Sequence, residues 1–317
     1  MKKWLWIGGT TIAIIGLLLF SLIKIGPLFN LYVIPPSPKA YAKIALEQME
    51  AQGLYAQGKK WDDIKSKTLE ETKNAKSYKE TSPYLEKALT VAGRKHSFLE
   101  TSEDNSQEDN AQYPKVKLND NKVLVVKLPE FTGNEKEATH YANIINQSLQ
   151  KENYKGVILD LRNNTGGDMG PMFGGISSLL KNGTLVTYID KDNDKTEVTL
   201  KGSETTYGGT PVKLKNTKKV KSVPIAVLIN DQTASSGEIT ALSLKGKSDV
   251  KYFGDNSASY TSANTSIKLY DDTMMNLTTQ KLKDNAGKIY ENNPIVPDVK
   301  TKHPEQDAIE WLQQTMK

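Results

Sequence analysis

The first apolar stretch of the chain is also its longest, and shorter apolar runs alternate with polar segments beyond it. Trp4 to Ile23 is a run of 20 residues without a charge, which as a helix would span about 30 Å of hydrocarbon. Lys2 and Lys3 precede the run, so the positive-inside rule places everything after it outside the cell. A cleaved signal peptide is the alternative, but its apolar region should be only about 7–15 residues long, and no small-x-small cleavage site follows. We expect an uncleaved, single-pass membrane anchor over residues 1–27 with a cytoplasmic N-terminus.

Residues 28–112 carry helical patterns and predict a helical domain. A helix should run from Pro38 to Gln52, because Ser37 can cap it, proline suits the first helical position and Gly53 can end it. A second helix is expected over residues 60–73. A third should begin at Ser82-Pro83, where Leu85, Ala88, Leu89 and Ala92 form one apolar stripe that Gly93 closes.

Residues 113–317 alternate strand-like and helix-like segments, which predicts an α/β domain with mainly parallel strands. The expected strands are 122–128, 156–161, 223–229 and 250–253, and the expected helices are 135–150, 172–180, 236–244 and 304–316. This alternation of strands and helices is interrupted at residues 184–215 and 260–290, where the chain has short runs of alternating apolar and polar residues. We expect both to be β-hairpin insertions that form a cap over the α/β core.

Composition excludes several kinds of chemistry. The chain has no cysteine, which removes disulfides, zinc-thiolate sites and a cysteine nucleophile. Its three histidines are too scattered for a two-histidine metal motif, so we expect no metal and no cofactor. The formal charge is +5, and three lysines that flank the apolar run account for all but +2 of it. Such a weakly basic chain is not a nucleic-acid binder.

Two loops that follow strand ends are candidates for chemistry, since open α/β sheets place their sites there. In the first, DLRNNTGG, Gly166 and Gly167 directly follow a buried strand and let the backbone approach a ligand. The alternative is an ordinary turn with a solvated Arg162. In the second, NDQTASSGEI, Ser235 stands at a helix N-terminus, where it is either a nucleophile or half of a capping box with Glu238.

The two loops together, in this order and at this spacing, resemble the C-terminal processing (tail-specific) serine peptidases. The resemblance implies a ClpP/crotonase-like mixed sheet with helices, here with an N-terminal helical bundle and a β-rich cap after one transmembrane helix. It also implies a role for each loop residue: Ser235 as nucleophile, the N–H groups of Ser236 and of Gly166 or Gly167 as oxyanion hole, and Arg162, Asn164 and Glu238 as supporting residues.

The family's general base is a lysine 25 residues past the nucleophile, where this chain has Tyr260. A serine without a base is a poor nucleophile, so another group must take its proton. His96 is our candidate, because His140 and His303 fit solvated positions better. A solvated loop position is the alternative for His96 as well.

The membrane-anchored, lantibiotic-degrading members of this family share further motifs with the chain: PPSP, KHSF around His96, PEFTGN and SAxYTSAN. This closer resemblance implies a Ser235–His96 dyad, with no third acid that we can assign.

The resemblance implies an extracellular, monomeric endopeptidase that removes the C-terminal tail of nisin or a related lantibiotic. We expect the residues flanking the two loops to bind this peptide: Met169, Met172, Phe173, Tyr260 and Ser262. The alternative for Met172 and Phe173 is the core of the following helix. Two other functions stay open, namely a broader tail-specific peptidase acting on envelope proteins and a non-catalytic immunity protein that only binds the lantibiotic.

Overall fold

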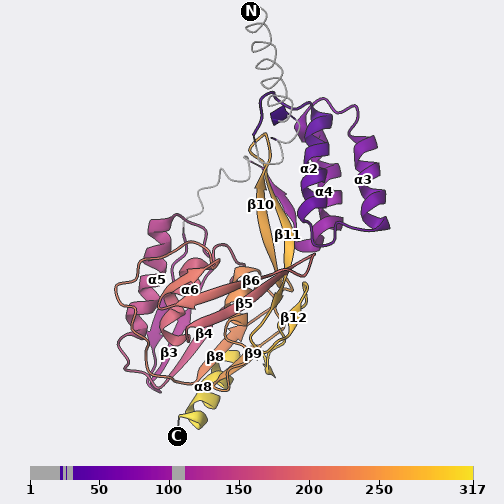
Figure 1. Cartoon of the computed structure of the whole chain (residues 1–317). Coiled ribbons are helices and arrows are strands. Elements are labelled where there is room, and N and C mark those ends of the chain that lie inside the picture. Colours follow the sequence, from indigo (N-terminus) through magenta and orange to yellow (C-terminus); the bar gives the residue numbers. More distant parts are fainter. Residues whose placement is uncertain (1–21, 24–25, 27–30, 102–110, 317) are drawn as a thin grey trace, which may run out of the picture. The chain divides into compact units, whose positions relative to one another are not determined.

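The computed structural model describes residues 22–23, 26, 31–101 and 111–316 of the 317-residue chain (Figure 1). The chain divides into two compact units. One unit combines Met1–Gln107 with Asn264–Thr279, and the other combines Glu108–Ala263 with Gln280–Lys317. The expected membrane span, residues 4–23, lies outside the described residues apart from its last two. Within the described part of the chain, no helix has both the length and the apolar character needed to cross a bilayer.

Three helices that lie side by side form most of the first unit (Figure 1). The Ser37 side chain accepts a hydrogen bond from the N–H of Ala40 and starts the first helix, which Gly53 ends as predicted. The elements of this unit are α2 (Pro38–Gln52), α3 (Lys59–Glu71), α4 (Tyr78–Gly93), the 3-10 turn η2 (Arg94–His96) and β1 (Phe98–Glu100), joined by parts of β10 (Ser262–Lys268) and β11 (Met274–Lys283).

The start of α4 differs from the prediction. The helix begins at Tyr78 rather than at Ser82-Pro83, because Ser77 accepts the N–H of Glu80 at 3.3 Å and serves as the cap. The ring of Tyr78 also stacks on that of Tyr41 with their centroids 4.6 Å apart. This packing holds the additional turn, and Pro83 is accommodated inside the helix.

The segment 264–279 belongs to the helical unit, which corrects its expected place in a cap over the α/β core. Leu269, Met275 and Leu277 are buried in one cluster with Trp61 of α3 and with side chains of α2 and α4. The first part of β11 pairs antiparallel with β1, with Phe98 opposite Asn276. Burial of these apolar side chains assigns the segment to the helices, which the alternating pattern alone did not reveal.

The second unit contains the α/β sheet, with strand order β13-β9-β8-β4-β3-β2. All neighbouring pairs are parallel except β2 with β3, as the alternation of strands and helices predicted. The strands are β2 (Lys115–Leu118), β3 (Val123–Lys127), β4 (Gly156–Asp160), β8 (Ile225–Ile229), β9 (Val250–Gly254) and β13 (Val299–Lys300). The helical elements are α5 (Glu135–Leu149), α6 (Gly170–Ile176), η4 (Ser177–Leu179), α7 (Ser236–Leu242) and α8 (Pro304–Thr315).

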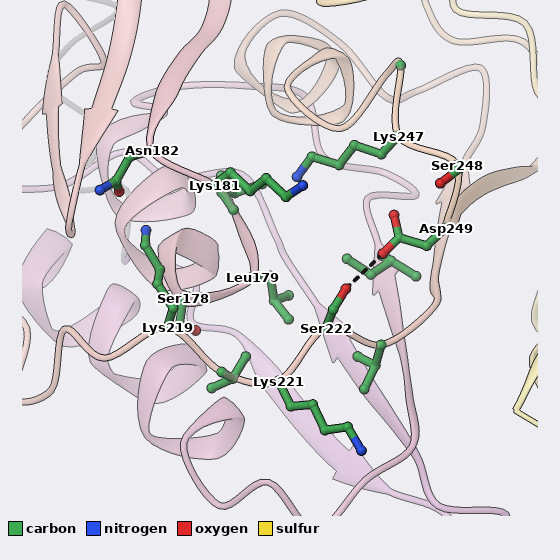
Figure 2. A pocket seen from close by; sticks show the side chains of 15 residues that line it. Ser178, Leu179, Lys181, Asn182, Lys219, Lys221, Ser222, Lys247, Ser248 and Asp249 are labelled. Atoms are coloured by element: carbon green, nitrogen blue, oxygen red, sulfur yellow. Dashed lines mark hydrogen bonds between the residues drawn. The ribbon is translucent and has the colours of Figure 1, made fainter.

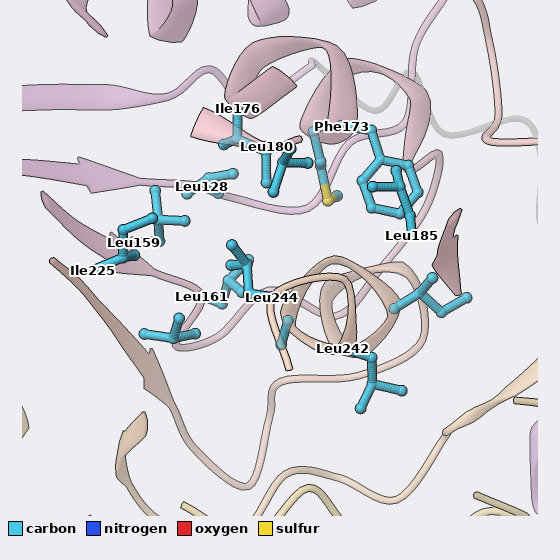
Figure 3. Close-up of a cluster of buried hydrophobic side chains, with 14 of the residues drawn as sticks. Leu128, Leu159, Leu161, Phe173, Ile176, Leu180, Leu185, Ile225, Leu242 and Leu244 are labelled. Carbon is cyan, nitrogen blue, oxygen red and sulfur yellow. The ribbon is translucent and has the colours of Figure 1, made fainter. Parts of the chain in front are cut away.

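Both faces of this sheet are buried. On β8, Ile225, Val227 and Ile229 face the cluster that includes side chains of α5, α6 and α7, part of which is drawn in Figure 3. Ala226 and Leu228 face the opposite cluster with side chains of α8. The strand therefore reads as a continuous apolar run, as expected for a parallel strand covered on both sides.

The remaining strands of the second unit are antiparallel. β5 (Gly183–Asp190) pairs with β6 (Lys195–Lys201), and β6 pairs with β7 (Glu204–Thr206). Beyond residue 279, β11 pairs with β5 and with β12 (Ile289–Tyr290). The apolar side chains of β5 and β6 join the same cluster as α5 and α6, so these strands pack on the α/β core.

Candidate active site

Ser235 stands at a strained turn between β8 and α7. Its backbone has φ 49° and ψ −119°, which a residue with a side chain rarely adopts. A serine on a sharp strand-to-helix turn of this kind presents its Oγ at the edge of the sheet. The residue is only half-buried, whereas Ser236 and the remainder of α7 are buried. The turn is therefore suited to exposing one hydroxyl.

The carboxylate of Glu238 holds this turn in place. It accepts the N–H of Ser235 at 3.0 Å, the hydroxyl of Ser257, and the N–H groups of Ser259 and Tyr260 at 3.1 and 2.8 Å. Burial raises the pKa of Glu238 to about 7, although all these hydrogen bonds favour its charged form. Glu238 thus does more than cap α7, because it joins the nucleophile turn to residues 257–260.

The Gly-Gly turn after β4 packs directly against Ser235. Gly166 and Gly167 have φ values of 121° and 82°, and a Cβ on Gly166 would lie 2.8 Å from the Cβ of Ser235. A Cβ on Gly167 would collide with the carbonyl oxygen of Phe131. Only glycine satisfies both the backbone angles and the space.

Asn164 and Ser236 fix the positions of these two glycines. The Asn164 side chain accepts the N–H of Gly166 at 3.0 Å and donates to the carbonyl oxygens of Leu128 and Pro129. The Ser236 hydroxyl donates to the carbonyl of Gly167. Among the described residues, the N–H groups of Gly167 and Ser236 find no protein acceptor. These two N–H groups, on the two loops, remain available to an oxyanion.

Two further contacts join the ends of β4 and β8. The backbone N–H of Asn163 donates to the side-chain oxygen of Asn230 at 3.0 Å. In return, the side-chain amide of Asn230 donates to the side-chain oxygen of Asn163 at 2.7 Å. Arg162 is half-buried, and it forms two hydrogen bonds with Asp160 at 2.8 and 2.7 Å and reaches Glu305 at 3.3 Å. It therefore supports the loop. Asn230 was not among the predicted site residues, although its position directly after β8 was an available signal.

Three of the five residues expected to contact substrate are in the protein core. Met172 and Phe173 are fully buried, which favours the alternative interpretation of them. Ser262 is also fully buried, and its hydroxyl donates to Asn292 at 2.8 Å. The expectation fails because helix packing and this hydrogen bond withdraw the three side chains from solvent. Met169 and Tyr260 are half-buried and remain candidates.

His96 lies in the first unit, and Ser235 in the second. His96 is 7% exposed in η2, so a solvated loop position is wrong for this residue. Burial, together with the charge of Lys95, lowers the pKa of His96 to about 4. Its imidazole is therefore neutral at pH 7. His140 and His303 are exposed, as expected for solvated residues.

Side chains from residues 264–279 hold the backbone around His96. The amide of Asn264 donates to the His96 carbonyl at 2.6 Å, and its oxygen accepts the hydroxyl of Thr278 at 2.8 Å. The N–H of Thr278 donates to the Ser97 hydroxyl at 2.8 Å. These partners were not among the predicted site residues, although Asn264 ends the SAxYTSAN motif.

No group of three or more histidine, aspartate or glutamate side chains among the described residues could hold a metal ion. The Ser235 turn offers a strained serine, a buried carboxylate behind it and two backbone N–H donors. This combination suits acyl transfer.

Comparisons with known proteins agree with this chemistry. The profile of peptidase family S41 matches residues 122–301. The chain is 46% identical over 308 residues to the nisin-resistance protein of Lactococcus lactis subsp. lactis, covering 96% of each chain. It is 28% identical to the carboxy-terminal processing protease CtpA of Bacillus subtilis, over 62% of this chain and 38% of that one.

Solved structures give the same result for the fold. A lipoprotein from Streptococcus agalactiae superimposes with a TM-score of 0.82 at 36% identity, covering 90% of this chain and 99% of that one. The photosystem II D1 C-terminal processing protease superimposes with a TM-score of 0.60 at 15% identity, over 88% of this chain and 98% of that one. At that identity the second likeness concerns the fold alone.

Proposed function

The chain belongs to peptidase family S41 and is a serine peptidase, and on that premise we propose that it cleaves the C-terminal tail of nisin or a related lantibiotic. The observation that carries the proposal is the 46% identity to a nisin-resistance protein along 96% of both chains. Similarity of this extent includes the helical unit as well as the peptidase unit.

In the proposed mechanism, the Oγ of Ser235 attacks the scissile carbonyl carbon and forms an acyl-enzyme. The strained turn and the four hydrogen bonds accepted by Glu238 support this assignment, because they hold Ser235 in one conformation before substrate arrives. The leaving amine takes a proton and departs. Water then hydrolyses the ester and restores the hydroxyl.

We propose His96 as the group that accepts the proton of Ser235 and passes it to the leaving amine. The family's lysine position holds Tyr260, so a lysine base is absent there. A neutral imidazole at pH 7 is in the protonation state that a general base needs. The hydrogen bond from Asn264 to the His96 carbonyl supports a fixed position for this residue.

The oxyanion would be held by the N–H groups of Ser236 and Gly167. Of the two glycines considered, Gly166 is the weaker candidate, since it is buried and its N–H already donates to Asn164. Gly167 is exposed, and the Ser236 hydroxyl holds its carbonyl. Met169 and Tyr260, half-buried beside the two loops, are the proposed substrate contacts.

We further propose that residues 4–23 anchor a monomeric protein in the cell membrane, with its catalytic part outside. The charge-free length of this run and the two lysines before it support the proposal. Such an anchor would concentrate the enzyme at the membrane surface.

Mass spectrometry of nisin and of an unmodified linear peptide, after incubation with the full chain in mild detergent, tests the cleavage. We expect nisin shortened at its C-terminus with the parent protein and intact nisin with Ser235→Ala and with His96→Ala. Ser66→Ala and His140→Ala, both at exposed positions, are the matched controls and should cleave like the parent.

Three outcomes would overturn parts of this proposal. Equal cleavage of the linear peptide would favour a broader tail-specific peptidase, which the similarity to CtpA supports. Intact nisin that co-purifies with the parent protein would favour sequestration. Cleavage by folded Ser235→Ala would remove Ser235 from the mechanism.

A further inference from the structure

A second candidate site lies in the α/β unit, in a cavity whose lining includes four lysines. The cavity has a volume of about 720 Å³ and is formed by residues 178–182, 219–223, 225 and 246–249 (Figure 2). This volume is in the range of pockets that bind small molecules. Nothing in the proposed peptidase mechanism uses these residues.

The cavity lies at the opposite edge of the sheet from Ser235. Ile225, the first residue of β8, lines it, whereas Ile229 at the other end of the strand leads into the nucleophile loop. The four residue-to-residue steps from Ile225 to Ile229 span about 13 Å of extended chain. Asp249, which also lines the cavity, directly precedes β9. The cavity is therefore distinct from the peptidase site.

The charge around the cavity is strongly unbalanced. Lys181, Lys219, Lys221 and Lys247 line it, against a single carboxylate, Asp249, which accepts the Ser222 hydroxyl at 3.1 Å. Burial lowers the pKa of Lys219 and of Lys247, and for Lys247 the charges of Lys181 and Lys219 act in the same direction while Asp249 opposes them. The ammonium groups of Lys181 and Lys219 therefore act unfavourably on that of Lys247.

The fold fixes the side chain of one of these lysines. The Nζ of Lys219 donates to the carbonyl oxygens of Ser177 and Gly202 at 2.9 and 2.7 Å, which fixes its position. Lys181 and Lys247 extend toward the same part of the cavity (Figure 2). A bound anion would relieve the repulsion that this arrangement creates.

The other side chains that line the cavity indicate what a ligand contains besides negative charge. Ser178 is 3% exposed, and its hydroxyl has no hydrogen-bond partner among the described residues. Leu179, Leu180, Val220 and Val223 supply an apolar wall. The positive charge of the lining comes from lysines, and a lysine ammonium binds a phosphate group as a point charge.

We propose that this cavity binds an organic phosphate, with the phosphate held by Lys181, Lys219 and Lys247 and the organic portion against the apolar wall. The ligand carries two negative charges on one compact group, which matches the clustered ammonium groups. Binding here does not depend on the peptidase assignment.

Isothermal titration of the full chain in non-ionic detergent at about 0.15 M salt tests this, since surface charges are largely screened there. The probes are phenyl phosphate, inorganic phosphate and acetate. We expect saturable binding of phenyl phosphate, weaker binding of inorganic phosphate and none of acetate. The double variant Lys181→Gln/Lys247→Gln should lower the affinity for phenyl phosphate at least tenfold. Lys115→Gln/Lys117→Gln, with the same charge change at exposed positions of β2, should bind like the parent.

The proposal fails if phenyl phosphate does not bind, or if both double variants weaken it equally, because either result would mean no specific site at the cavity. Equal affinity for phenyl phosphate and inorganic phosphate would contradict the proposal that the ligand has an organic portion bound to the apolar wall. Circular dichroism of each variant ensures that a loss of binding is not a loss of fold. Nisin cleavage by Lys181→Gln/Lys247→Gln should equal that of the parent, which separates this site from Ser235.

Discussion

The surroundings of Ser235 and those of His96 are built in different ways. Ser235 is held by Glu238, three residues away, and by the Gly-Gly turn at the end of a neighbouring parallel strand. His96 is held through Asn264, 168 residues later in the chain. The nucleophile turn thus follows from two short motifs at strand ends, whereas the His96 segment depends on a hairpin remote in sequence.

The largest expected effect comes from breaking the contact between the Gly-Gly turn and its neighbours. Gly167→Ala places a methyl group against the Phe131 carbonyl at φ 82°, so we expect a loss of about 3 kcal/mol in the free energy of unfolding and about 100-fold in kcat/KM. Denaturant unfolding and a cleavage assay measure both.

Gly287→Ala is the matched control for Gly167→Ala. Gly287 has a similar φ of 89°, with nothing within 4 Å of the added methyl group. It should lose only about 1 kcal/mol, from the backbone alone. Equal losses in the two variants would mean that the contact with Phe131 is unimportant.

A smaller effect is expected at Glu238. Gln in its place offers one acceptor where the carboxylate offers two, so Glu238→Gln should lower kcat/KM by about 10-fold or more while the chain stays folded. Glu204→Gln, at an exposed position of β7, is the control and should leave kcat/KM unchanged.

Glu238 also predicts a pH dependence of stability. Because burial raises its pKa to about 7, the folded chain keeps a proton between about pH 4.5 and 7 that an unfolded glutamate has released. This group therefore makes the free energy of unfolding fall as pH rises through that window, by at most about 1.4 kcal/mol per pH unit. Denaturant unfolding at pH 5, 6 and 7 should show this slope reduced in Glu238→Gln. Parallel curves for parent and variant would contradict the raised pKa.

The smallest effect is expected in the His96 segment. Asn264→Ala removes the donor to the His96 carbonyl and the acceptor for Thr278, so we expect kcat to fall about 10-fold with KM nearly unchanged. Asn264→Asp keeps the acceptor for Thr278 but places an oxygen against the His96 carbonyl, so it should lower kcat at least as much. Asn285→Ala, at an exposed position, is the control. A rise in KM instead would assign Asn264 to substrate binding rather than to positioning.

Local signals in the sequence predicted much of the fold. The cap at Ser37, the proline after it and Gly53 predicted α2, because such signals act within one turn of the helix. The apolar run at residues 223–229 predicted a strand, and the structure shows that β8 is buried on both faces. The predicted start at Ser82-Pro83 was wrong because tertiary contact between Tyr78 and Tyr41 stabilises an earlier start.

The sequence also predicted some of the candidate site residues correctly and others wrongly. Ser235, Ser236 and the two glycines lie together at the carboxyl ends of adjacent parallel strands, as their positions after β4 and β8 indicated. Met172, Phe173 and Ser262 are near these loops in sequence but buried, since neighbours along a helix or strand face different directions. Glu238 was expected to support α7, and its contacts with Ser257, Ser259 and Tyr260 required the fold.

The α/β alternation, the family and the two loops at strand ends could be read from the sequence, because strand periodicity, glycine turns and helix caps act over a few residues. Only the tertiary structure decided that residues 264–279 complete the helical unit and hold His96, that Glu238 is buried with a raised pKa, and that four lysines line one cavity. These features arise from burial and from contacts between distant segments, and a one-dimensional pattern records neither.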